Sequence, residues 1–566
     1  MRGKIIAGAL LGMLLCGFGT SASAYDSQLK PFPDVPAGDW GEESVYALSA
    51  VGIISGYDDG TFRPDDQVTR EAFLKMLVTS WQEDAATDEQ PGAAGGSAPV
   101  QPIAPPPPAT EPALPPLAGV SPERWSYPFV ERAYEEGLLG AMIDGGAFQP
   151  DKPMTREEVA VAVGRELFGH MTADERRSWS DSGWKAERQT RAFADDGEID
   201  VSQAVYAYLT AHAAIMVGDA GRFRPDATLT RREAAAILYR TINERSGDAP
   251  LDVTGFYAIR SYADIDKLDA LGHVAFGWSH LDYAAPGAAS LNVDTTEYKL
   301  PADWQSAVQA AQAAGVSRDL MVYANNEGRM LDAFLGDSLA QMAFLASLQE
   351  KLAAAPDAFT GVTLDWEGLL DERLQNPYVD FLRQVKRAIG DLPLTVAVQP
   401  TFYYKGYDMA AIGALADRVI LMAYDFTYDP DRLPSAPLPL VGETVAAVLR
   451  DVPRSKLVLG ISKQANQWTT AADGVTTSAK PTADMVEARL KTEGVQAQTE
   501  MPYFLRHITF RDQRGAHEIW YEDADAIARK LWLARYYGLS GISLWRMGLF
   551  TEQDWDVIRQ AGRVAG

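Results

Sequence analysis

The stretch Thr360–Glu367 reads TGVTLDWE, a short apolar run with two acids near its end. Side chains alternate along a strand, so Thr363, Asp365 and Glu367 share one face, and the apolar residues between them share the other. This pattern predicts a strand that carries two carboxyl groups on one face, at its C-terminal end.

Seven more short apolar runs lie between residue 251 and the C-terminus. Ala-rich segments with helical character separate them, such as 304–314 and 524–537. Eight β–α units over about 310 residues predict a closed (β/α)8 barrel. An open doubly wound sheet is the alternative, because the pattern alone does not prove closure. The eight predicted strands are Val253–Ile259, His273–Trp278, Asp319–Tyr323, Gly361–Trp366, Leu394–Gln399, Arg418–Tyr424, Lys456–Ile461 and Gly541–Trp545.

In such a barrel the functional residues lie at the C-terminal ends of the strands. This rule places Asp365 and Glu367 in the lumen at the catalytic rim. Burial and the like charge of a close neighbour both favour the neutral form of a carboxyl group. We therefore expect one of these two acids to have a raised pKa and to donate a proton near neutral pH.

The same stretch resembles the catalytic signature of glycoside hydrolase family 18, Asp-x-x-Asp-x-Asp-x-Glu, with Thr360 and Thr363 in place of the first two acids. The residues 422–425, Met-Ala-Tyr-Asp, resemble the family's Met-x-Tyr-Asp on the sixth strand, and Trp545 closes the eighth strand as the family's tryptophan does. The stretch 517–548 is most similar to spore cortex-lytic and peptidoglycan N-acetylglucosaminidases.

The resemblance implies hydrolysis of N-acetylglucosamine-containing glycans in which the acetamido group of the substrate is the nucleophile. Glu367 would protonate the leaving oxygen, Asp365 would hold the acetamido N–H, and Tyr424 would bind its carbonyl. Thr363 removes an acid that pairs with the middle Asp in the family, which bears on the pH optimum. The residues expected to bind substrate are Gln399, Asp425, Trp545, Tyr257 and Trp278, although ordinary packing is an equal alternative for rim aromatics such as the last two.

Three blocks before the barrel repeat one pattern: an apolar helix end, a Gly/Asp-rich turn, Phe-x-Pro-Asp, then Thr-Arg at the start of a helix. They span residues 52–73, 137–159 and 214–234. These blocks resemble S-layer homology repeats. The resemblance implies a helical trio around a pseudo-threefold axis that binds secondary cell-wall polysaccharide.

The arginine of each Thr-Arg pair is the expected ligand for an anionic glycan, because guanidinium forms a forked grip on carboxylate. These residues are Arg70, Arg156 and Arg231, with Trp40 and Trp125 as stacking partners. The alternative is that each arginine only pairs within its own repeat. The second repeat keeps its tryptophan and the third does not, so we expect Arg156 to contribute more than Arg231.

The predicted domain division starts with a secretory signal peptide, because the N-terminus has two basic residues, a short apolar run and Ala-Ser-Ala before the cleavage point. A lipoprotein signal at Cys16 is the alternative. The sequence does not decide whether repeat one packs with the other repeats across the linker. The segments are the signal peptide (1–24), repeat one (25–84), a Pro/Ala/Gly-rich linker (85–118), repeat two (119–180), repeat three (181–248) and the barrel (249–566).

The net charge of −26 disfavours nucleic acid and anionic lipid as partners. We expect no cofactor and no metal, since the six histidines are scattered and form no His-Glu-x-x-His. The sequence thus predicts a bacterial cell-wall enzyme acting on peptidoglycan-type glycans. Two alternatives remain open: a chitinase, and a catalytically silent barrel that serves as a glycan-binding module.

Overall fold

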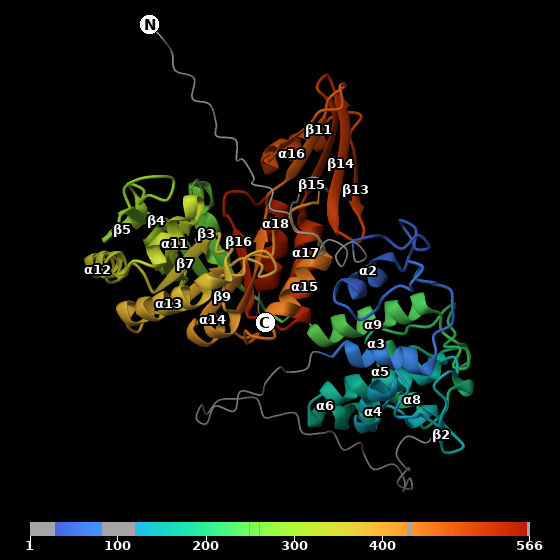
Figure 1. Ribbon diagram of the computed structural model, residues 1–566. Coiled ribbons are helices and arrows are strands. Elements are labelled where there is room, and N and C mark those ends of the chain that lie inside the picture. Colours follow the sequence, from blue (N-terminus) through green and yellow to red (C-terminus); the bar gives the residue numbers. More distant parts are fainter. Residues whose placement is uncertain (1–28, 82–118, 248, 260, 427–432, 563–566) are drawn as a thin grey trace.

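The computed structural model describes residues 29–81, 119–247, 249–259, 261–426 and 433–562. Figure 1 shows a helical N-terminal domain beside a barrel, with a small sheet projecting from the barrel. The predicted signal peptide and linker lie outside the described residues.

The N-terminal domain consists of helices in which the three Thr-Arg motifs begin α3, α5 and α9. Thr69, Thr155 and Thr230 are the N-caps, and each side chain accepts a backbone N–H from the first turn. The second and third caps are reciprocal boxes with a glutamate. The helices are α2 (Glu42–Ala50), α3 (Arg70–Thr79), α4 (Tyr127–Glu135), α5 (Arg156–His170), α6 (Ala173–Ser178), α7 (Trp184–Thr190), α8 (Ala204–His212) and α9 (Arg231–Ser246), with two short strands, β1 (Ile143–Asp144) and β2 (Ala147–Phe148).

A cyclic set of backbone hydrogen bonds joins the three repeats. Val68 N–H donates to the carbonyl of Leu229 (3.0 Å), Leu229 donates to Met154 (3.1 Å), and Met154 donates to Val68 (2.9 Å). Each residue belongs to a different repeat, and each lies two positions before the arginine of its motif. Repeat one therefore packs with repeats two and three, which the sequence had left open.

The C-terminal domain is a closed parallel barrel, so the predicted fold is confirmed and the open sheet is excluded. The strands follow one another around the barrel, and β3 pairs with both β4 and β16 to close it. All eight predicted strands are present. They are β3 (Asp252–Ala258), β4 (His273–Ala285), β6 (Ser317–Asn325), β7 (Gly361–Glu367), β8 (Leu394–Val398), β9 (Arg418–Leu421), β10 (Leu457–Ser462) and β16 (Gly541–Trp545).

Helices surround this barrel and bury the outer faces of the strands (Figure 1). The short strand β5 (Ala288–Asn292) pairs with the end of β4. The helices are the 3-10 segment Ser261–Ala270, α10 (Trp304–Ala313), α11 (Met330–Leu335), α12 (Ser338–Ala354), α13 (Gln375–Ile389), α14 (Met409–Leu415), α15 (Leu438–Val448), α17 (Ala524–Tyr536) and α18 (Glu552–Gly562).

An insertion between β10 and α17 forms a separate five-stranded antiparallel sheet, which the sequence did not predict. Residues of α16 (Ala483–Leu490) and one face of the sheet form a small core of their own. The strands are β11 (Asn466–Thr470), β12 (Thr476–Ala479), β13 (Gln496–Glu500), β14 (Leu505–Asp512) and β15 (Gly515–Tyr521).

The helical domain packs directly on the barrel. On α17, Trp532 donates its indole N–H to Asn243 of α9 (2.7 Å), and Arg529 pairs with Glu43 of α2 (2.7 Å). At Gly442 of α15 a Cβ atom would lie 2.5 Å from the carbonyl oxygen of Ala50, so only glycine permits this approach. Among the described residues, no helix is both long and apolar enough to cross a membrane.

Candidate active site

The two acids of β7 lie in the barrel lumen at the C-terminal end of the strand. Asp365 is buried, Glu367 is partly exposed, and β6 pairs Tyr323 with Asp365 and Asn325 with Glu367. The opposite face of β7 carries Trp366, which packs among aromatic rings of α11, α12 and α13. The alternation in the sequence therefore sorts the acids into the lumen and the apolar side chains into the core.

Burial dominates the electrostatics of this pair. It raises the pKa of Glu367 to about 7, with the charge of Asp425 as a further cause. Burial and the charge of Glu367 raise the pKa of Asp365 well above its usual range. Glu367 is thus a carboxyl group that holds a proton near neutral pH and reaches solvent.

Tyr424 and Asp425 follow β9 and come close to the two acids. Tyr424 is buried, and its pKa is raised well above the ordinary value by burial and by the charges of Asp365 and Glu367. Gly460 on β10 leaves room for the ring, since a Cβ there would lie 3.0 Å from it. Tyr424 is therefore a neutral hydroxyl beside the acids, able to donate a hydrogen bond.

Asp425 is exposed and has a left-handed backbone, with φ of 58°. Its N–H donates to Ser435 Oγ (3.1 Å), and Gln464 Nε2 donates to its Oδ1 (3.0 Å). These contacts hold an exposed carboxylate in place next to the pair. Its charge contributes to the raised pKa of Glu367.

Gln399, just beyond β8, supports the turn that follows Glu367. Its Oε1 accepts the N–H of Gly368 (2.6 Å), and the hydroxyl of Tyr407 lies 3.4 Å from the same oxygen. Tyr407 also donates to the carbonyl of Trp366 (2.7 Å). Gln399 thereby fixes the backbone next to Glu367.

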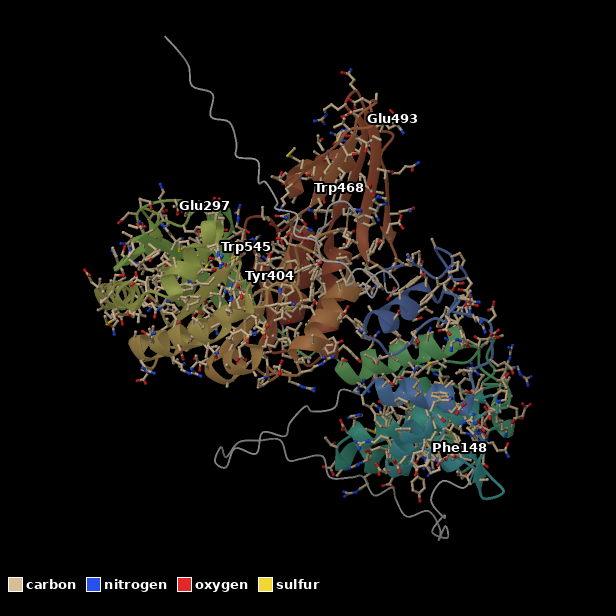
Figure 2. The ribbon with its side chains drawn as sticks, in the orientation of Figure 1. Phe148, Glu297, Tyr404, Trp468, Glu493 and Trp545 are labelled. Carbon is tan, nitrogen blue, oxygen red and sulfur yellow. The ribbon has the colours of Figure 1, made fainter. Side chains whose placement is uncertain are left out.

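Trp545 ends β16 and is half-buried, with its ring edge-on to Phe256 at 5.2 Å. Figure 2 labels Trp545 together with Tyr404, which follows β8. The pKa of Tyr404 is raised by burial and by the charges of Glu367 and Asp425, so Tyr404 lies near both. Trp545 is thus an aromatic residue at the C-terminal end of a barrel strand, and Tyr404 is one in the loop that follows β8.

The predictions for Tyr257 and Trp278 need correction. Both side chains are only 2% exposed, and Trp278 packs against Phe276 at 4.1 Å and Trp304 of α10 at 6.5 Å. They lie on the outer face of the barrel, under a helix. Ordinary packing, the alternative weighed from the sequence, accounts for them.

Two tyrosines near the acids were missed. Tyr298 and Tyr323 stack at 4.2 Å, and burial together with the charges of Asp365 and Glu367 raises the pKa of both. Tyr323 is the last residue of a predicted strand and faces the lumen, so its position could have predicted that it lies near the acids. Tyr298 comes from a loop that no sequence pattern connects to the site.

In the helical domain, Arg156 and Arg231 occupy equivalent positions at the junctions between repeats. Arg156 Nε donates to the carbonyl of Phe223 (2.7 Å), and Arg231 Nε donates to that of Phe62 (2.9 Å). Each arginine therefore faces the turn of the following repeat. Neither guanidinium has a carboxylate within ion-pair distance among the described residues. Burial lowers the pKa of both, so each cation is poorly solvated.

Arg70 differs from these two, and its prediction needs correction. Its side chain has no exposed surface, and its guanidinium forms an ion pair with Glu158 of repeat two. In the first repeat the glutamate stands one place early, at Glu71, and accepts from Arg124 and Ser126 instead of completing a capping box. Arg70 therefore stabilises the junction and offers no surface to a ligand.

Trp40 and Trp125 are exposed, at 61% and 55%. Trp40 lies beside the start of α9, since the Arg232 guanidinium is 5.5 Å from its ring. Trp125 lies beside the start of α3, where its neighbour Arg124 pairs with Glu71. The contacts of the described residues thus place Trp40 at the helix start that carries Arg231, and Trp125 at the helix start that carries Arg70. On this placement we expect Arg231 to contribute more to glycan binding than Arg156 does.

Comparison with known proteins identifies both parts. Residues 323–549 match the family "Glycosyl hydrolases family 18", and residues 31–74, 120–160 and 207–235 match the "S-layer homology domain". The barrel is a glycoside hydrolase family 18 domain, and the helical domain consists of S-layer homology repeats.

Among curated proteins, the cortical fragment-lytic enzyme of Bacillus subtilis is 28% identical over 248 residues, which cover 41% of this chain and 56% of that protein. The outer membrane protein SlpA of Thermus thermophilus is 42% identical over 79 residues, 14% of this chain and 8% of that one. The chain spans about half the length of the Bacillus subtilis relatives that it matches.

Among solved structures, the spore cortex-lytic enzyme SleL of Bacillus cereus is similar at 20% identity, with a TM-score of 0.46. The match covers 55% of this chain and 74% of SleL. A chitinase from Chromobacterium violaceum is similar at 22% identity, with a TM-score of 0.47, over 55% of this chain and 99% of the chitinase.

Proposed function

We propose that the barrel hydrolyses β-1,4 bonds in N-acetylglucosamine-containing glycans of the peptidoglycan type, with Glu367 as the general acid. One observation carries the proposal: Glu367 ends β7 at the lumen, and burial raises its pKa to about 7. An acid with a pKa near the working pH is well matched to proton donation. The 28% identity to a cortical fragment-lytic enzyme supports this class of glycan over chitin.

The reaction that fits these residues uses the substrate as its own nucleophile. Glu367 protonates the glycosidic oxygen as the acetamido oxygen attacks the anomeric carbon and the glycosidic bond breaks. Asp365 accepts the acetamido N–H, and the hydroxyl of Tyr424 donates to its carbonyl oxygen. Water, deprotonated by Glu367, then opens the cyclic intermediate. Asp365 and Glu367 share one strand face, so both act from one side of the sugar ring.

The other site residues bind and orient. Trp545 forms an apolar floor for the sugar, and the exposed carboxylate of Asp425 accepts hydrogen bonds from its hydroxyl groups. Gln399 keeps the turn after Glu367 in place through its contact with Gly368. No cofactor or metal is needed for these steps.

We also propose that the repeats attach the enzyme to acidic secondary cell-wall polysaccharide after export. Arg231 and Arg156 supply desolvated cations without a carboxylate partner among the described residues. A bound carboxylate would satisfy them. Trp40 and Trp125 offer exposed ring faces for stacking against sugars.

Parallel digestion of purified peptidoglycan and colloidal chitin tests the activity, with Glu367→Gln as the control. The proposal predicts soluble reducing ends from peptidoglycan with the unchanged enzyme and none with the variant. Release from chitin alone would make the enzyme a chitinase. Release from neither polymer, with glycan binding intact, would make the barrel a silent binding module.

A further inference from the structure

A buried carboxylate lies in the lumen below the two acids, and the proposed reaction does not use it. Asp319 of β6 has its Oδ2 within hydrogen-bond distance of two hydroxyls, Thr363 Oγ1 at 2.8 Å and Thr395 Oγ1 at 3.2 Å. Gly361 leaves space for it, because a Cβ there would lie 2.4 Å from Asp319 Oδ1. The structure thus accommodates a carboxylate beside Thr363.

Charged groups at the base of the lumen are paired with one another. Arg418 donates to Asp252 Oδ2 (2.6 Å) and Thr254 Oγ1 (2.9 Å), and His273 Nδ1 lies 2.8 Å from the same Asp252 oxygen. Burial raises the pKa of Asp319, and the hydroxyl of Thr363 and the charges of His273 and Arg418 oppose this rise. The closest partners of Asp319 are therefore hydroxyls, whose orientation it controls.

The hydroxyl of Thr363 has a single hydrogen. Since that hydrogen is donated to Asp319, the oxygen of Thr363 is only an acceptor toward its other neighbours. The next residue up on the same face is Asp365, whose buried Oδ1 has no hydrogen-bond partner among the described residues. Thr363 and Asp365 are not hydrogen-bonded to each other in this structure. A buried neutral acid needs an acceptor for its proton, and the oxygen of Thr363 is such an acceptor on the same strand face.

We propose that Asp319 is a positioning residue: from β6 and through Thr363, it supplies the carboxylate that β7 lacks at position 363. It orients the neutral form of Asp365 so that the acid proton faces Thr363 and the other oxygen accepts the acetamido N–H of the substrate. The inference rests on the proposed function and leaves the bonds made and broken unchanged. Asp319 thus replaces the carboxylate of the Asp that the family signature has at position 363.

Asp319→Asn tests this role in the full chain with a chromogenic chito-oligosaccharide. Loss of the charge should lower kcat about tenfold with KM changed less than about twofold, the cost of a mispositioned catalytic group. Asp252→Asn is the matched control: it removes a carboxylate from the same lumen that does not contact Thr363. It should keep kcat within about threefold of the unchanged enzyme.

Rescue separates positioning from a merely structural role. The double variant Asp319→Asn, Thr363→Asp moves the carboxylate back to β7 and should restore kcat to within about threefold. If Asp319→Asn does not fold, Thr363→Val interrupts the same contact and should show the same loss. Unchanged kcat in folded Asp319→Asn, or a folded double variant as slow as the single one, would overturn the inference. Absent turnover by the unchanged enzyme would instead refute the proposed function.

Discussion

Replacing Glu367 by glutamine removes a proton donor and a buried ionisable group while keeping the size of the side chain. Without a general acid, kcat should fall by at least about 10². The same change has a second consequence that depends on the fold alone. The pKa of Glu367 is about 7 in the folded protein, against an ordinary value of 4.5.

Between pH 4.5 and about 7, the folded protein therefore keeps the proton on Glu367, whereas the unfolded chain releases it. Stability of the unchanged protein falls as pH rises from 4.5 to about 7, and the loss is complete above that. At 1.36 kcal/mol per pKa unit the loss is about 3 kcal/mol as an upper bound. Glutamine carries no charge, so Glu367→Gln should gain stability relative to the unchanged protein as pH rises.

Thermal unfolding of both proteins between pH 4.5 and 8 measures this difference. We expect nearly equal Tm at the acidic end and a higher Tm for Glu367→Gln at pH 8. Glu372→Gln, at an exposed position of the same loop region, is the control and should show no such trend. A Tm difference for Glu367→Gln that does not change with pH would refute the argument that burial holds the proton on this residue.

Tyr424→Phe should lower kcat by about 10² with little change in Tm, because only a hydroxyl donor is lost; an unchanged kcat would remove Tyr424 from the site. The kcat/KM of the unchanged enzyme should fall as pH rises through about 7, where Glu367 loses its proton; a profile flat to pH 9 would contradict Glu367 as the acid. In co-sedimentation with cell wall, using the inactive Glu367→Gln background, Arg231→Ala should weaken binding more than Arg156→Ala, because Trp40 lies beside the start of α9, the helix that Arg231 begins; the reverse order would contradict this placement of the binding site.

The barrel could be predicted from the sequence because its strands are short apolar runs separated by helices. The insertion could not, because strands such as Gln496–Glu500 (QAQTE) carry little apolar pattern, and the buried residues of that sheet form two small clusters on its two faces. Alternation within Thr360–Glu367 predicted the acid pair, since polar and apolar side chains mark the two faces.

The same reasoning failed for Tyr257 and Trp278 because both faces of their strands are apolar. Phe256 touches Trp545, whereas Tyr257, one residue later, packs under the outer helices. The sequence of such a strand does not show which of its two faces points into the barrel lumen. The prediction for Arg70 failed for another reason: Arg70 pairs with Glu158 of repeat two, and pairing between repeats cannot be read from any single block.

Two properties of the reaction test the central claim most directly: the anomeric configuration of the first product, and the need for an N-acetyl group on the substrate. If the acetamido oxygen is the nucleophile, the anomeric carbon is inverted twice. Proton NMR of the fresh product should then show the β anomer, and de-N-acetylated oligomers should be nearly inert although they keep their other hydroxyl groups. A thiazoline analogue of the cyclic intermediate should inhibit. An α anomer in the fresh product, or rapid hydrolysis of the deacetylated substrate, would contradict the mechanism even if Glu367 proved essential.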